Sequence, residues 1–114
     1  MDQETAIKSF VEKVVQRFKP QAIYLFGSRA RGDNLLHSDY DFIIVSEEFE
    51  KLKWLHRIYA LVKFWEADEN IDIIPYTPAE FRDKKINSST IRSAMKDARL
   101  VYGKENLSNL NRAA

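Results

Sequence analysis

Residues 25–42 constrain the fold of this chain more than any other stretch. An apolar run ends there in a Gly-Ser turn, and a second apolar run begins with Asp-x-Asp. The runs 21–26 and 39–45 are short and rich in aliphatic and aromatic residues, which is typical of buried strands. This stretch therefore predicts two strands joined by a loop that carries several polar and charged side chains.

The rest of the chain supplies helices and two more strands. Apolar residues recur at helical spacing in several segments, and Thr77-Pro78-Ala79-Glu80 has the composition of a helix start. An order that alternates helices and strands indicates an α/β protein of α+β-like character, with helices packed on a small sheet. The predicted helices are 5–18, a helical turn after Ser28, 50–67, 78–85 and 87–98, and the predicted strands are 21–26, 39–45, 71–76 and 100–102.

Length and composition favour one domain over residues 1–103, followed by a polar tail, 104–114, that we expect to be flexible. The chain has 114 residues, of which 45% are hydrophobic and 31% charged. It contains no cysteine, which excludes disulfides and thiolate chemistry, and no apolar run of membrane-spanning length. The polar N-terminus does not resemble a signal peptide. We expect a cytoplasmic protein.

Charge is unevenly distributed along the chain although the net charge is only +1. Residues 33–72 carry ten acidic and four basic side chains, whereas residues 82–114 carry eight basic and three acidic ones. The acidic centre suits cation binding, and the basic end suits phosphates or an acidic partner. The basic residues could equally be the solvated faces of helices.

Asp39 and Asp41 are the first candidates for chemistry. Two residues apart on a strand, their side chains point to the same face, with Cβ atoms about 6.6 Å apart. A pair of carboxylates at this spacing needs a compensating cation or a raised pKa in one member. Oxygen ligands of this kind favour Mg²⁺, with Mn²⁺ as a possibility, over zinc.

Asp72 is the third candidate because it stands alone in the apolar run Ile-Asp-Ile-Ile. If the strands 39–45 and 71–76 are neighbours, Asp72 faces the same site as Asp39 and Asp41. Three carboxylates could then hold two metal ions about 3.5–4 Å apart. The alternative is a solvent-facing aspartate on an edge strand.

Gly27 and Ser28 supply the other half of the predicted site. A glycine allows close approach of the backbone to a phosphate, and the serine adds N–H and hydroxyl donors. Arg29 and Arg31 follow directly and could contact phosphate oxygens, or could be solvated loop charges. The sequence lacks the glycine-rich fingerprints of P-loop and dinucleotide-binding proteins.

The motif Phe-Gly-Ser-Arg-Ala-Arg-Gly followed by Ser-Asp-Tyr-Asp resembles the signature of the DNA polymerase β-like nucleotidyltransferases, in particular their minimal (MNT) branch. The likeness is close over residues 23–45. It implies a nucleotidyltransferase fold with a small mixed sheet, and Mg²⁺-dependent transfer of a nucleoside monophosphate, most often AMP from ATP. Gly27 and Ser28 would hold the triphosphate, while Asp39, Asp41 and Asp72 would bind metal, with Asp72 also orienting the acceptor hydroxyl.

The resemblance also implies a partner. MNT proteins are commonly encoded beside a HEPN-domain toxin and act as its antitoxin, and they are implicated in adenylylating a tyrosine of that toxin. Two alternatives stay open: an antitoxin that neutralises its partner by complex formation without catalysis, and nucleotidylation of a small molecule such as an aminoglycoside. We expect a homo- or hetero-oligomer to be possible, and no direct nucleic-acid partner.

Overall fold

Four strands and the helices packed on them define the fold of the computed structural model, which describes residues 1–104. All of the predicted tail 104–114 except Lys104 lies outside the described residues. The described strands begin and end within one residue of the predicted ones, which confirms the α/β class. In chain order the elements are α1 (Gln3–Phe18), β1 (Ala22–Phe26), α2 (Ser28–Arg31), β2 (Tyr40–Val45), the 3₁₀ helix η1 (Glu47–Lys51), α3 (Trp54–Val62), β3 (Ile71–Tyr76), α4 (Pro78–Asn87), α5 (Ser89–Asp97) and β4 (Arg99–Gly103).

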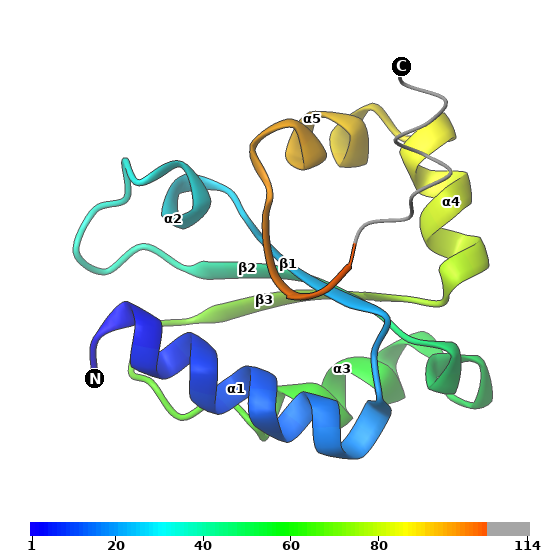
Figure 1. The fold of residues 1–114 in the computed structure, drawn as a ribbon, viewed down its shortest axis with the longest axis horizontal. Helices are drawn as coiled ribbons and strands as arrows, with labels where there is room; N and C mark the ends of the chain where they lie inside the picture. The colour runs from blue at the N-terminus through cyan, green and yellow to red at the C-terminus, as the bar shows by residue number, and fades with distance from the viewer. Residues whose placement is uncertain (105–114) are drawn as a thin grey trace.

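The strands form one mixed sheet in the order β3-β2-β1-β4. β1 pairs antiparallel with both β2 and β4, and β2 pairs in parallel with β3. A parallel pair requires a crossover connection, which η1 and α3 provide here. As a result β1 ends, and β2 and β3 begin, at the same end of the sheet (Figure 1).

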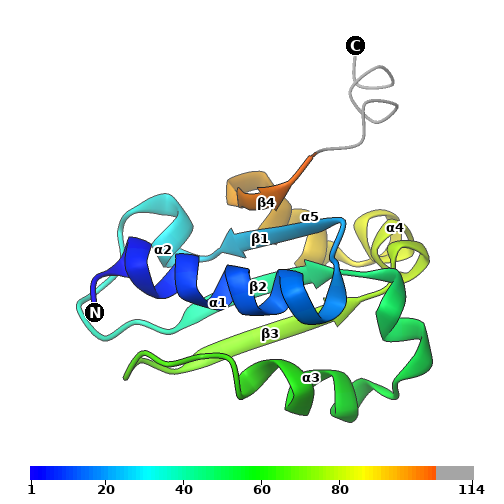
Figure 2. The same ribbon diagram turned by 60° about the horizontal axis from the view of Figure 1, so that its bottom comes forward.

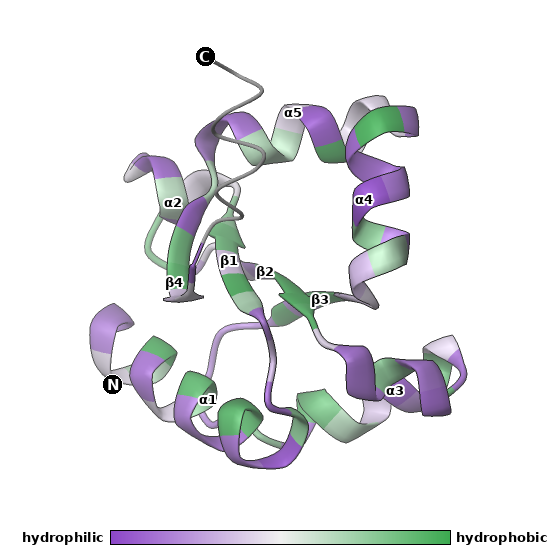
Figure 3. Ribbon diagram, turned by 45° about the vertical axis from the view of Figure 1, so that its right-hand side comes forward, coloured by the Kyte–Doolittle hydropathy of each residue, from purple (hydrophilic) through white to green (hydrophobic). Residues whose placement is uncertain are grey.

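Helices cover both faces of the sheet. α1 and α3 pack on one face, and α4 and α5 lie over the other (Figures 1 and 2). Hydrophobic residues are concentrated on the central strands, and they alternate with hydrophilic residues along the helices (Figure 3). No helix within residues 1–104 is both long and apolar enough to cross a bilayer.

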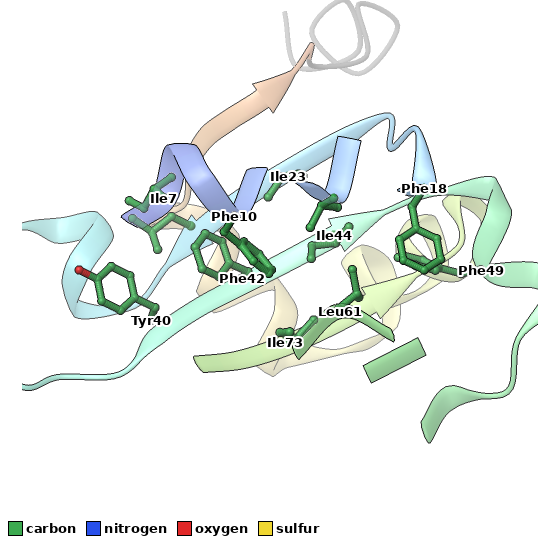
Figure 4. Close-up of a cluster of buried hydrophobic side chains, with 12 residues drawn as sticks. Ile7, Phe10, Phe18, Ile23, Tyr40, Phe42, Ile44, Phe49, Leu61 and Ile73 are labelled. Carbon is green, nitrogen blue, oxygen red and sulfur yellow. The ribbon is translucent and has the colours of Figure 1, made fainter. Parts of the chain in front are cut away.

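The larger hydrophobic cluster lies between the sheet and α1 and α3 (Figure 4). Phe10 of α1 packs against Phe42 of β2 with ring centroids 5.0 Å apart, and Phe18 packs against Phe49 at the same separation. Truncation of one such fully buried phenylalanine typically costs about 3–5 kcal/mol. Tyr40 lies at the end of this cluster, where β2 begins, and is 2% exposed.

The predicted single helix 50–67 is wrong. The chain instead forms η1, becomes extended at Leu52 and Lys53, and then forms the shorter α3. The carbonyl oxygen of Leu52 accepts a hydrogen bond from Nε of the buried Arg57. This side-chain bond satisfies a backbone group that a continuous helix would have paired internally, and apolar periodicity alone does not reveal it.

The predicted start of α4 is confirmed in detail. Thr77 caps the helix and forms a capping box with Glu80. Oε1 of Glu80 also accepts a hydrogen bond of 2.6 Å from Arg57, so the cap connects α4 to α3. Burial alone would raise the pKa of the Glu80 carboxyl, but the hydrogen bonds from Arg57 and Thr77 lower it below its ordinary value.

Candidate active site

Strand register places Asp41 and Asp72 side by side. Asp41 of β2 is paired with Asp72 of β3 on one side and with Phe26 of β1 on the other. Ile43 and Ile74, two positions further along β2 and β3, belong to the cluster beneath α4 and α5. Because side chains alternate along a strand, Asp41, Asp72 and Phe26 share this face. The strands 39–45 and 71–76 are therefore neighbours, which meets the condition under which Asp72 faces the same site as Asp41.

The carboxyl of Asp41 lies in an environment that disfavours its ionised form. Its pKa is raised to about 6, first by burial and then by the negative charges of Asp72 and Asp39. Asp41 is partly buried, whereas Asp39 and Asp72 are exposed. A partly buried carboxyl with two acidic neighbours favours either protonation or a bound cation, as the sequence predicts for Asp39 and Asp41.

Gly27 lies directly against Asp41. Its φ of +74° falls in the region that favours glycine, and a Cβ added there would lie 2.6 Å from Oδ2 of Asp41. Glycine therefore leaves space beside the carboxylate that any other residue would fill. Ser28 follows as the first residue of α2, which is only four residues long.

A cleft of about 500 Å³ opens beside Gly27, between the end of β1 and the helix α5. Clefts of roughly 300–1,000 Å³ are the usual size for small-molecule ligands. The sequence analysis missed the α5 side of this cleft, although Ser89, Ser93 and Asp97 recur every four residues and so form one polar face of a helix. The lining residues are Phe26, Gly27, Arg31, Ser89, Thr90, Ser93, Ala94 and Asp97.

The two candidate arginines lie in different environments. Arg31 lines the cleft and pairs with the exposed Asp33 at 3.2 Å. Arg29 is 7% exposed and donates hydrogen bonds to four acceptors inside the protein. Arg31 is therefore placed to meet a ligand in the cleft, whereas the donors of Arg29 are already engaged elsewhere.

The donor set at the end of the sheet fits a hard divalent cation. Within residues 1–104, no three His, Cys, Asp or Glu side chains are grouped closely enough to enclose a metal ion unaided. Magnesium does not require such a cage, because it usually binds one or two carboxylates and completes its shell with water and phosphate oxygens. The adjacent Asp41 and Asp72, with Asp39 close enough to raise the pKa of Asp41, meet this requirement.

The paired carboxylates of β2 and β3 therefore lie next to the cleft that Gly27 lines. The family model "Nucleotidyltransferase domain" matches residues 7–101. The chain belongs to this family, and it is a nucleotidyltransferase.

Two similar proteins agree with this family assignment. The chain is 33% identical over 105 residues to MJ0604 of Methanocaldococcus jannaschii, provisionally named a protein adenylyltransferase, and the match covers 90% of this chain and all of that protein. The crystal structure of a provisionally named nucleotidyltransferase from Sulfolobus solfataricus is similar, with a TM-score of 0.63 and 28% identity over 90% of this chain and 81% of the other.

A third similarity concerns the fold alone. A chain in a crystal structure described as a toxin–antitoxin with AMP-PNP has a TM-score of 0.51 and 21% identity to this chain, covering 89% of it and 77% of the other. Together these findings confirm the nucleotidyltransferase fold that the Gly-Ser and Asp-x-Asp motifs predict.

Proposed function

We propose that this protein transfers AMP from ATP to a hydroxyl group of a partner protein. The observation that carries the proposal is the pairing of Asp41 with Asp72 beside the cleft lined by Gly27. The hydroxyl would release its proton to solvent, its oxygen would bond to the α-phosphorus, and the bond between that phosphorus and the departing pyrophosphate would break. The catalytic unit in this proposal is residues 1–103.

Each side chain has a distinct role in this scheme. Asp39, Asp41 and Asp72 would hold Mg²⁺, either one ion or two, and Mn²⁺ would be a chemically similar substitute. When bound, the metal would supply positive charge that stabilises the charge developing on the phosphate oxygens. Asp72 is the more exposed of the two paired carboxylates, so its oxygens can also accept a hydrogen bond from the acceptor hydroxyl.

The nucleotide would occupy the cleft between β1 and α5. The space left by Gly27 would admit the phosphates, with the N–H and hydroxyl of Ser28 and the guanidinium of Arg31 as donors. The hydroxyls of Ser89 and Ser93 on α5 would face the rest of the nucleotide. Arg29 would act from inside the fold and not on the phosphates, because its donors are already engaged.

The proposed partner is a HEPN-domain toxin, with one of its tyrosines as acceptor, so that this chain acts as an antitoxin in the cytoplasm. Three observations support this: the motif resemblance, the name of the Methanocaldococcus jannaschii relative, and the fold shared with a chain of a toxin–antitoxin structure.

The test is transfer of label from α-³²P-ATP to the co-purified toxin in the presence of Mg²⁺. We expect the Asp39→Asn/Asp41→Asn double variant to lose labelling by at least a hundredfold. Asp83→Asn, an exposed aspartate on α4, is the matched control and should label normally. Labelling that survives in the double variant would refute the assigned site. Full neutralisation of toxin by that variant in cells would instead favour an antitoxin that works by complex formation.

A further inference from the structure

Leu35 and Leu36 expose large apolar side chains in the loop between α2 and β2. Each is 80% exposed, although leucine is among the residues most often buried. The two leucines precede Asp39 by three to four residues, and β2 begins directly after Asp39, at the end of the sheet where β1 ends and β3 begins (Figure 1). A single exposed apolar residue on a protein surface needs no explanation, but two adjacent exposed leucines form a small apolar patch that does.

Hydrogen bonds fix the backbone of the Leu35–Ser38 turn. The N–H of Leu35 donates to Oγ of Ser38 at 2.9 Å, and the N–H of Ser38 donates back to the carbonyl of Leu35 at 3.2 Å. Arg29 donates from Nη2 to the carbonyl of Leu36 at 3.2 Å and from Nε to the carbonyl of Ser38 at 3.0 Å. The turn is therefore held in one shape at both of its ends.

Arg29 connects this turn to the core. Its Nη1 donates to Oε1 of Gln3 on α1 and to the hydroxyl of Tyr40, both at 3.1 Å. The guanidinium also lies over the Tyr40 ring, 3.9 Å from its centroid, and Tyr40 belongs to the buried cluster. Because a buried arginine anchors the carbonyls of the turn, the two leucines are held outward and not left free to fold onto the protein.

A second set of exposed apolar residues lies on α3, where Leu55, Tyr59 and Val62 are spaced as one helix face. The helix α3 lies on the side of β3 away from β1 (Figure 2). It follows η1, which begins two residues after the end of β2, whereas Asp39 and Asp41 lie at the start of β2. The Leu35–Ser38 turn, unlike the α3 face, directly precedes Asp39 in the chain.

The surroundings of the turn are acidic. Asp33 and Asp39 flank the turn in the chain, and the segment 66–69 contains three acids. This segment lies close to the start of β2, because the N–H of Tyr40 donates to the carbonyl of Asn70 at 2.9 Å. A complementary surface would present apolar side chains to the leucines and basic side chains around them.

We infer that the Leu35–Ser38 turn is the docking surface for the protein that accepts the nucleotidyl group. The inference rests on the proposed function and names the occupant: a folded partner with an apolar patch and a basic rim beside its acceptor hydroxyl. Contact with the two leucines would bring that hydroxyl toward Asp72. A small acceptor would have no need of this surface.

The experiment compares two neutral double variants, Leu35→Asn/Leu36→Asn in the turn and Leu55→Asn/Tyr59→Asn on α3. The HEPN-domain toxin of the proposed function, purified separately, serves as acceptor, and a fluorescent ATP analogue reports nucleotide binding. For the turn variant we expect KM for the toxin to rise at least tenfold, with the Kd of the nucleotide analogue changed less than twofold. The α3 variant should match the unmodified chain in both.

Two results would overturn the inference: an unchanged KM for the toxin in the turn variant, or a KM raised equally in the α3 variant. The single variant Leu36→Asn provides a milder version if the double variant unfolds. If the unmodified chain transfers no label, the proposed function fails, and calorimetric binding of the toxin then judges the docking surface. Binding weakened by the turn variant alone would support it, and equal binding by both variants would refute it.

Discussion

Replacing Asp41 by asparagine should stabilise the metal-free protein at neutral pH while abolishing transfer. The carboxyl is partly buried between β1 and β3, and its ionised form is disfavoured by burial and by the charges of Asp72 and Asp39. Asparagine has nearly the same shape and carries no charge. The variant therefore removes an unfavourable charge and leaves the packing of the site intact.

The magnitude follows from the pKa, which is raised from 3.8 to about 6. At 1.36 kcal/mol for each pKa unit, the cost of ionising Asp41 reaches about 3 kcal/mol. Solvent reaches part of the side chain, which reduces this to about 1–2 kcal/mol. Because 1 kcal/mol shifts the Tm of a small domain by about 4–8 °C, the variant should melt about 5–10 °C higher at pH 7.5.

The sign of the pH dependence is fixed by the raised pKa. Stability from the protonated carboxyl is fully present below pH 3.8 and is lost as the pH rises through about 6. The unmodified chain should therefore lose about 1–2 kcal/mol between pH 4 and pH 7.5 relative to Asp41→Asn. Thermal unfolding followed by circular dichroism in EDTA, at several pH values, measures this difference.

Three further results belong to the same experiment. The two proteins should melt within about 2 °C of each other at pH 4, where both side chains are neutral. Added Mg²⁺ should raise the Tm of the unmodified chain at pH 7.5 and leave that of the variant nearly unchanged. Two results would refute this explanation of Asp41: an asparagine variant that is less stable than the unmodified chain at pH 7.5, or a stability difference between the two proteins that does not depend on pH.

Other substitutions test the remaining supports of the site. Gly27→Ala should lower the free energy of unfolding by about 1–3 kcal/mol and weaken nucleotide binding, because the added Cβ would collide with the Asp41 carboxylate. The control is Gly32→Ala, because Gly32 also has a positive φ but has open space around it. This control should cost about 1–2 kcal/mol and leave nucleotide binding unchanged. Arg57→Met should cost about 3–4 kcal/mol in urea unfolding, since it leaves the carbonyls of Leu52 and Pro75 unpaired; a loss below about 1 kcal/mol would contradict this role. Arg29→Lys should lower the free energy of unfolding by about 2–3 kcal/mol, because an ammonium group cannot reach all four acceptors of the guanidinium. Amide hydrogen exchange at Leu35 and Ser38 should become faster in this variant. Unchanged exchange would exclude Arg29 as the anchor of the turn.

Much of the fold could be predicted from local sequence. Strand ends were predicted to within one residue, because the apolar runs are short and are bounded by proline, glycine and polar segments. The capping box at Thr77 was predictable because the interaction spans only three residues. The helix 50–67 was predicted incorrectly, since its interruption depends on Arg57 reaching back to Leu52 and across to β3 and α4.

The candidate site also has features that the sequence predicts and features that depend on the tertiary structure. The local sequence predicts the Gly-Ser turn and the Asp-x-Asp pair, because their residues are close in the chain and their spacing sets their geometry. It identified Asp72 as unusual, but only the parallel pairing of β2 with β3 decided that Asp72 lies beside Asp41. Strand register results from packing between residues far apart in the chain, so no local pattern could fix it.

The environments of the two candidate arginines also depend on the tertiary structure. Arg29 and Arg31 are two residues apart and look equivalent in the sequence, yet one is buried against Tyr40 and the other lines the cleft. The α5 wall of the cleft likewise comes from residues about sixty positions beyond Gly27. Residue types determined the chemistry available to this chain, whereas long-range packing decided which of those groups meet, because burial and proximity depend on the whole fold.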